Sequence, residues 1–419
     1  MDLNTGATAW MLISASLVLL MTPALAFFYG GMSRTKSVLN MMMMSFGAMA
    51  VTAVVYVLWG WSMSYGGSDI GGIVANPFTQ FGLKGTMFDS AGEFLLDGYG
   101  VPVVVGVAFQ MTFAIITVAL ISGAIADRVK YSTWLVFVAV WVTLAFFPMA
   151  HMVWGGGALS GVGWFSGIAA PIDFAGGTVV HINAGMAGLV LAIVAGKRRG
   201  FGSDVMRPHS LPFVMLGAAL LWFGWFGFNA GSSFTADGLA GLAWVNTTVA
   251  TAAAILGWLA VEKIRHGNFT SLGAASGTVA GLVAITPAAG SVGPLGAIAI
   301  GAIAGAVCEL AISLKYKYNF DDSLDVVGVH LVGGLVGTVL IGFFSMETGL
   351  FGGGGFNQLI VQILVALVAI VFSGVMTLII ALALKKTMGW RVSEEAEITG
   401  IDFAEHGETA YESPVSANR

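Results

Sequence analysis

The chain has 419 residues, of which 57% are hydrophobic and only 9% are charged, and its mean hydropathy is +0.89. This balance excludes an ordinary soluble domain and predicts an all-α protein that crosses a membrane many times. The single cysteine, Cys308, excludes an intramolecular disulfide framework and a cysteine-based metal cluster, while the net charge of -5 says little because the placement of positive residues decides topology.

Apolar runs long enough to span a bilayer predict eleven transmembrane helices. They cover residues 8–32, 38–65, 99–125, 132–153, 174–196, 211–231, 239–261, 271–289, 293–314, 325–345 and 356–385. The stretch Thr22–Ala26 in the first run imitates a signal-peptide cleavage site. No basic residue precedes it and the apolar run continues to Tyr29, so we interpret this run as a retained helix.

The basic residues fall almost entirely after the odd-numbered predicted helices. Only Lys84 lies in an even-to-odd connection. The positive-inside rule therefore predicts an external N-terminus and a cytoplasmic C-terminus, which agrees with an odd number of helices. The basic residues of the odd-to-even connections are Arg34, Lys36, Arg128, Lys130, Lys197, Arg198, Arg199, Arg207, Lys263, Arg265, Lys315, Lys317, Lys385, Lys386 and Arg391.

Two parts of the chain are predicted from this division: a transmembrane domain over residues 1–385 and a cytoplasmic tail over residues 386–419. The tail is polar and acidic, a composition typical of an appendage that orders against a partner. The longer external loops, over residues 66–97 and 155–172, do not resemble folded domains.

A sequence repeat relates the two halves of the transmembrane domain. The pattern His181, Gly185, Gly188, Val190 recurs as His330, Gly334, Gly337, Val339, with Asp173 and Asp325 as the upstream acids. Halves made of helices 1–5 and 6–10 must have opposite topology because five is odd. The repeat therefore predicts an inverted-repeat architecture around a central pore, with a site near the membrane midplane.

His181 and His330 lie within predicted membrane helices, where polar groups are costly and commonly functional. One interpretation is two separate structural histidines, each bonded to a backbone carbonyl. The duplication favours a shared site in which one imidazole donates a proton and the other accepts it, as in a proton relay. Metal binding is a weaker alternative, because no acid or cysteine stands at ligand spacing.

Aromatic residues near external helix ends form a second candidate site. An interfacial aromatic belt would explain Trp154 and Trp225. A tryptophan face beside the hydroxyl of Ser232 could instead hold a small cation by cation–π attraction and one hydrogen bond. The candidate binding and pore-lining residues are Phe109, Gln110, Phe113, Trp154, Trp225, Phe228, Ser232 and Thr286.

Asp173, which opens the fifth predicted helix, has two alternatives: an N-cap, or a carboxylate that favours a cation near the outer mouth. Asp325 has the same alternatives at the cytoplasmic end. His151 is assigned to an outer helix end. The remaining histidines, His209, His266 and His406, lie in predicted cytoplasmic segments and are taken as incidental.

At these positions the chain resembles the ammonium transporter (Amt/Mep/Rh) family, and its bacterial Amt branch most. The resemblance covers nearly the whole chain, and its most specific motif is Asp173–Asn183. The other motifs are Phe27–Met32, Ala108–Gln110, Ala150–Gly156, Gly224–Ser232 and Asp325–His330. One departure is the stretch over residues 161–171, which is longer than in compact relatives and could reshape the outer vestibule.

The resemblance implies roles for individual residues. Phe113, Trp154 and Ser232 would line an external ammonium site, and Asp173 would support recruitment. Phe113 and Phe228 would form the gate, and His181 and His330 the twin-histidine pair. It also implies a homotrimer with one pore per subunit, and a regulatory tail (residues 389–395 and 406–411) on which a PII-type signalling protein docks.

The resulting hypothesis is selective ammonium uptake across a bacterial plasma membrane. Ammonium would lose a proton at the outer site, neutral ammonia would cross a dry pore, and the histidines would convey the proton, making transport electrogenic. The alternatives are an electroneutral ammonia gas channel and an ammonium sensor that signals through its tail. No nucleophile–base pair or metal set favours an enzyme, and no cofactor, nucleic acid or partner beyond lipid, PII-type protein and further copies is expected.

Overall fold

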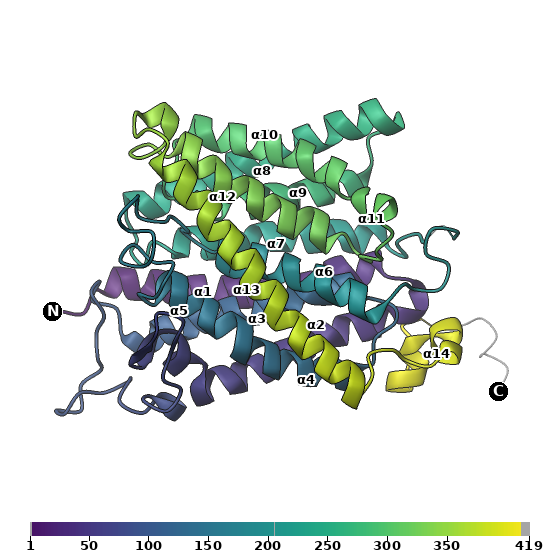
Figure 1. Ribbon diagram of the computed structural model, residues 1–419, viewed down its shortest axis with the longest axis horizontal. Helices are drawn as coiled ribbons and strands as arrows, with labels where there is room; N and C mark the ends of the chain where they lie inside the picture. The colour runs from purple at the N-terminus through teal and green to yellow at the C-terminus, as the bar shows by residue number, and fades with distance from the viewer. Residues whose placement is uncertain (1, 205, 412–419) are drawn as a thin grey trace.

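The computed structural model describes residues 2–204 and 206–411, and it is mostly a bundle of long helices (Figure 1). The α-helices are α1 (Thr5–Met32), α2 (Val38–Val55), α3 (Val103–Ile121), α4 (Tyr131–Trp141), α5 (Phe147–Trp154), α6 (Asn183–Ala195), α7 (Leu211–Gly231), α8 (Gly238–His266), α9 (Ser271–Ile285), α10 (Pro294–Ala311), α11 (Leu314–Lys317), α12 (Val332–Phe344), α13 (Asn357–Thr387) and α14 (Glu394–Thr399).

Short 3₁₀ and π segments extend or connect these helices, and two strands form a small antiparallel hairpin. The segments are η1 (Thr35–Ser37), η2 (Tyr56–Gly60), η3 (Ser62–Gly66), η4 (Phe81–Leu83), η5 (Ser122–Ile125), η6 (Val142–Phe146), η7 (Gly177–Ile182), η8 (Val327–Leu331), η9 (Leu350–Gly352) and η10 (Asp402–His406). The strands are β1 (Asp69–Ile70) and β2 (Val74–Ala75).

The predicted helix ranges agree closely with the observed ones. Ten helical segments of the described chain are long and apolar enough to cross a membrane. The predicted range 271–289 corresponds to α9, a shorter apolar helix over Ser271–Ile285. The polytopic all-α architecture is therefore confirmed, while the count of eleven crossings stays a prediction.

The long helices run broadly along one direction, and α13 crosses diagonally over the others (Figure 1). Helix α1 packs along α7, and α8 packs along α10. The N-terminus and the loop that precedes α3 lie at the left end of this view, whereas α11 and α14 lie at the right end (Figure 1).

Charged residues from four connections meet at the right end of the bundle. Asp127 accepts from Arg34 (3.2 Å) and from Arg198 (3.3 Å), and Arg198 also pairs with Asp321 (2.8 Å). Burial alone would raise the pKa of Asp321, but hydrogen bonds from Arg198 and the charge of Arg128 lower it below its ordinary value. The connections predicted to be cytoplasmic thus share one end, although the side of the membrane on which it lies stays a prediction.

The tail packs against its own chain, whereas its composition indicated an appendage that orders against a partner. Asp402 accepts from the backbone N–H groups of Leu39 (3.0 Å) and Asn40 (2.8 Å), so it caps the first turn of α2. Glu397 accepts from the backbone of Arg199 at 2.7 Å and pairs with Arg391. Asp402 thus satisfies two N–H groups that α2 leaves unpaired, and Glu397 joins the tail to the connection after α6. These two contacts hold the acidic tail against its own chain.

Candidate functional site

The two repeated histidines meet in the middle of the bundle. Their Nδ1 atoms are 3.3 Å apart, and their rings are nearly parallel, with an interplanar angle of 17°. Both side chains are buried. A hydrogen bond between two imidazole nitrogens needs one protonated and one unprotonated atom, so His181 and His330 share a proton at this contact.

Each histidine lies in a π-helical segment, His181 in η7 and His330 in η8. A π turn widens the helix by one residue and shifts the direction of its side chains, and such turns occur frequently at functional sites. Helix α6, which follows η7 directly, packs closely on η8: a Cβ added to Gly185 of α6 would lie 2.3 Å from the backbone nitrogen of Leu331. Any larger residue at position 185 would push α6 away from η8.

Asp173 caps the segment that carries His181. Its carboxylate accepts from the backbone N–H groups of Gly176 (2.7 Å), Gly177 (2.6 Å) and Thr178 (2.8 Å), and also from the Thr178 hydroxyl. Its backbone carbonyl accepts from Nε1 of Trp154 at 2.9 Å. Of the two alternatives for Asp173, these contacts favour the cap, and the same residue orients Trp154.

The equivalent cap in the second half is Asp322, so the pairing of Asp173 with Asp325 was wrong. Asp322 accepts from Val326 (3.1 Å) and Val327 (2.7 Å) at the start of η8. Asp325 has a left-handed backbone (φ 64°) and pairs with Lys315 at 2.6 Å. Burial and the neighbouring Asp325 carboxylate raise the pKa of Asp322 to about 6.

A narrow apolar lumen adjoins the histidines. Its volume is only about 10 Å³, at the lower limit for holding one water molecule. Trp225 stacks on His181 with centroids 5.6 Å apart and donates from Nε1 to Thr286 Oγ1 at 2.8 Å. Thr286 therefore positions Trp225 and is absent from the lumen wall, which consists of Met21, Leu25, Phe28, Ile116, Leu120, Val180, His181, Leu221, Trp225, Phe228, Val279 and His330.

His181 presents an unpaired nitrogen in this region. Its Nε2 is buried and has no hydrogen-bond partner within residues 2–204 and 206–411. A buried polar atom without a partner is costly, and such an atom commonly marks a place where a ligand or water binds. Its ring borders the lumen, so a small hydrogen-bonding molecule there could satisfy it.

Two stacked phenylalanines separate the lumen from a wider outer cavity. The rings of Phe113 and Phe228 lie 4.2 Å apart at 22°. Phe113 lines the outer cavity and Phe228 lines the lumen, so this pair forms the partition. Phe109 lines neither, and packs edge-on against Phe113 with centroids 4.8 Å apart.

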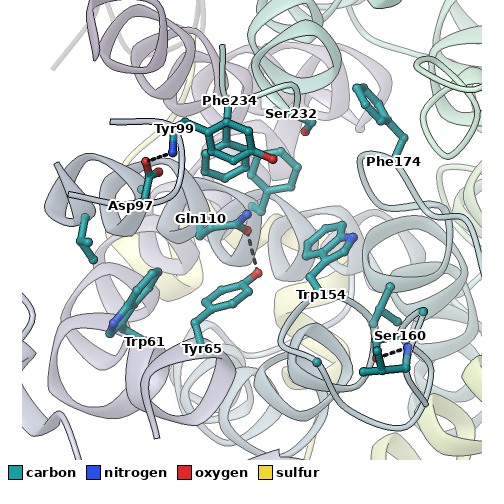
Figure 2. Close-up of a pocket in the computed structure, with 17 residues that line it drawn as sticks. Trp61, Tyr65, Asp97, Tyr99, Gln110, Trp154, Ser160, Phe174, Ser232 and Phe234 are labelled. Atoms are coloured by element: carbon teal, nitrogen blue, oxygen red, sulfur yellow. Dashed lines mark hydrogen bonds between the residues drawn. The ribbon is translucent and has the colours of Figure 1, made fainter. Parts of the chain in front are cut away.

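The outer cavity is a vestibule of about 610 Å³ (Figure 2). Trp154 and Ser232 lie in it, and the Phe113 ring meets Trp154 at 88° with centroids 5.9 Å apart. The Ser232 hydroxyl donates to the Phe228 carbonyl at 2.8 Å, which leaves its oxygen free to accept. An indole face, a phenyl ring and a hydroxyl acceptor together suit a small cation that carries N–H groups.

Gln110, a predicted pore-lining residue, lines the vestibule and accepts from the Tyr65 hydroxyl at 2.8 Å. The vestibule also contains residues that the sequence did not single out, among them Tyr65 itself and Tyr99, which stacks on Phe234 with centroids 5.8 Å apart. Asp97 comes from the loop before α3. No repeat or helical spacing marks these residues, because they come from connections and helix ends whose folding decides which side chains face the cavity.

The stretch over residues 161–171 contributes to the vestibule. Gly161 and Val162 line it together with Ser160. The expectation that this stretch reshapes the outer cavity is consistent with that position. Within the described part of the chain, no group of three or more His, Cys, Asp or Glu residues is placed to hold a metal ion.

Comparisons with known proteins find relatives along nearly the whole chain. The model of the Ammonium Transporter Family matches residues 9–411. An ammonium transporter of Mycobacterium tuberculosis is 56% identical over 98% of this chain and 91% of its own length. An ammonium transporter of Bacillus subtilis is 45% identical over 98% of this chain and 99% of its own length.

Solved structures with the same fold include two that superpose along nearly the whole chain. A protein described as a sensor Amt protein superposes with a TM-score of 0.86 at 28% identity, covering 96% of this chain and 98% of that one. Mep2 of Saccharomyces cerevisiae superposes with a TM-score of 0.85 at 29% identity, covering 99% of this chain and 93% of that one.

Proposed function

The chain belongs to the ammonium transporter family and carries ammonium across a membrane, and we propose that it does so by separating ammonium into ammonia and a proton. The observation that carries this proposal is the buried histidine pair, with 3.3 Å between the Nδ1 atoms, beside a lumen too narrow for a hydrated ion. An unpaired charge in such surroundings costs tens of kcal/mol by Born-type estimates.

In the proposed first step, ammonium binds in the vestibule between Trp154, Phe113 and Ser232. The two aromatic rings attract the cation, and the Ser232 oxygen accepts one N–H. One N–H bond then breaks, its electron pair stays on nitrogen, and ammonia forms. The proton passes to the water of the vestibule and from there toward the histidines.

In the second step, ammonia passes Phe113 and Phe228 and enters the lumen. There the unpaired Nε2 of His181 is available to hydrogen-bond with it. The pair His181 and His330 accepts the proton and passes it on through the Nδ1 contact. Ammonia and proton recombine at the far side, so one positive charge moves per ammonium. Potassium has no proton to lose and therefore stays in the vestibule.

Proteoliposomes test this proposal when current and lumenal pH are recorded together. We expect current after an ammonium pulse and none after a potassium pulse. The variant with both His181→Ala and His330→Ala should lose the current or the selectivity, because the relay is gone. If the double variant keeps a selective ammonium current, the histidines have no such role.

An electroneutral ammonia channel is the second candidate, favoured by the dryness of the lumen. It would carry ammonia without its proton, so the lumen of the vesicle would become alkaline without current. A sensor is a third candidate, because a protein described as a sensor Amt protein shares the fold. Tight ammonium binding without transport would favour the sensor.

We also propose a homotrimer with one pore per subunit, an inner-membrane location, and a cytoplasmic face that docks a PII-type protein. The support is family membership and the ordered tail beside the basic connections. Mass measurement of the detergent-solubilised protein tests the trimer. Co-purification with the host PII protein, with and without residues 388–419, tests the docking.

A further inference from the structure

The vestibule is much larger than one ammonium ion. Its volume is about 610 Å³, whereas a molecule of the size of water occupies about 30 Å³ in the liquid. In this view Trp154 and Ser232 lie toward one side of it and Asp97 and Trp61 toward the opposite side, while the Tyr99 ring, stacked on Phe234, lies between them (Figure 2). An ion at Trp154 therefore leaves most of the opposite side vacant.

Asp97 is the charged residue of this vestibule. Among the 17 described residues that line it, no other carries a formal charge at neutral pH. Oδ1 of Asp97 accepts from the backbone N–H groups of Tyr99 (2.8 Å) and Val101 (3.0 Å), which fixes the carboxylate in a turn. Its Oδ2 has no donor in the described chain, and the side chain is half-buried.

Other groups that line the same vestibule also suit a cation. The Tyr65 hydroxyl donates to Gln110, so the lone pairs of its oxygen remain available. Trp61 and Tyr65 pack together with centroids 5.1 Å apart, and the Tyr99 ring is stacked on Phe234. Aromatic faces next to a carboxylate attract small cations, and a cleft lined by one sign of charge raises the local concentration of its counter-ion.

We propose that Asp97, together with Tyr65 and Tyr99, forms a second binding position for a small monovalent cation, which ammonium occupies before it reaches Trp154 and Ser232. The proposal rests on the transport function proposed above. It assigns Asp97 to capture and not to the chemical step. A carboxylate with aromatic neighbours attracts any small cation, so this position concentrates ammonium and the later site selects it.

The test compares Asp97→Asn with Asp89→Asn in the same proteoliposome assay. The two aspartates are well matched: each lies in the loop before α3 and accepts through Oδ1 from two backbone N–H groups. Asparagine keeps that acceptor in both turns and removes the same charge. Asp89 does not line the vestibule.

For Asp97→Asn we expect the ammonium KM at low ionic strength to rise about two- to fivefold, the range of an exposed ion pair, with the maximal rate unchanged. Raising the salt from about 10 mM to about 300 mM should increase the KM of the unmodified protein, and this dependence should flatten in Asp97→Asn. Asp89→Asn should behave like the unmodified protein.

An unchanged KM in Asp97→Asn, an equal change in both variants, or a fall in maximal rate at constant KM would each overturn the proposal. The first result would mean no capture, the second a general surface charge, and the third a role in translocation or folding. Absence of transport by the unmodified protein would instead contradict the proposed function, so the two failures are distinguishable.

Discussion

The stacked pair of Phe113 and Phe228 makes a quantitative prediction about ion selectivity. The lumen behind it has a volume of about 10 Å³, whereas roughly 10–15 Å³ is needed to admit one water molecule. Replacing Phe228 with alanine removes a phenyl ring from the lumen wall and opens room for water. A potassium ion could then keep part of its hydration shell as it passes.

The expected effect on potassium is large. An unpaired ion loses tens of kcal/mol of hydration in a dry apolar pore. If the admitted water restored only about 3 kcal/mol, the rate of potassium passage would rise roughly 100-fold. We therefore expect Phe228→Ala to conduct potassium at least that much faster than the unmodified protein, measured as current from proteoliposomes under a potassium gradient.

Phe137→Ala is the matched control. Phe137 is also fully buried and packs against Trp134 and Trp390, but it lines neither cavity. Both variants should lose about 3–5 kcal/mol of stability, as buried phenylalanine truncations commonly do. A folded Phe228→Ala protein that still excludes potassium would refute the claim that a water-free lumen blocks the ion. If Phe137→Ala conducted potassium equally fast, loosened packing and not water in the lumen would be the cause.

Three further predictions concern residues around the site and in the charged cluster of Asp127, Arg198 and Asp321. Trp225→Phe should lower stability by about 1 kcal/mol by removing one buried hydrogen bond, seen as a lower thermal unfolding temperature; an unchanged temperature would argue against that bond. Asp173→Ala should raise the ammonium KM, because the cap that holds Trp154 is lost, and it should lower stability by about 0.5–2 kcal/mol. Uptake measures the KM and thermal unfolding measures the stability; an unchanged KM would contradict the prediction. The lowered pKa of Asp321 means that its ionised form stabilises the folded protein above its ordinary pKa and that this contribution disappears as pH falls through the lowered value. Asp321→Asn should therefore lower the free energy of unfolding by about 3–5 kcal/mol at pH 7, and this free energy should fall less steeply on acidification than in the unmodified protein. If stability falls with pH in parallel for the two proteins, Asp321 does not contribute to its pH dependence.

Much of the pore could be predicted from the sequence, because intramembrane polar residues are rare and costly. His181 and His330 stand out for that reason, and their duplication predicted the contact that the structure shows. The helix ranges were predictable because a bilayer demands long apolar runs. In both cases the membrane restricts which residues can occur, so the restriction is visible in the sequence.

Other features depend on backbone geometry that spacing does not reveal. The cap of η8 is not one of them, because Asp322 precedes His330 by the same number of residues as Asp173 precedes His181. Asp325 lies nearer to His330 and pairs instead with Lys315, from a left-handed backbone. Asp97 and Tyr65 line the vestibule because the connection between η3 and α3 folds at the helix ends. The π turns at both histidines likewise leave no sign in composition or periodicity.

The cap that Asp402 provides to α2 has a consequence for the biosynthesis of the protein. The residues that it joins, Asn40 and Asp402, are 362 positions apart, so α2 emerges from the ribosome long before its cap exists. At typical synthesis rates of about 5–20 residues per second, the first turn of α2 waits roughly 20–70 seconds for its partner. A chain released before Asp402 is made never receives this cap, so a segment made late in synthesis completes a helix made early.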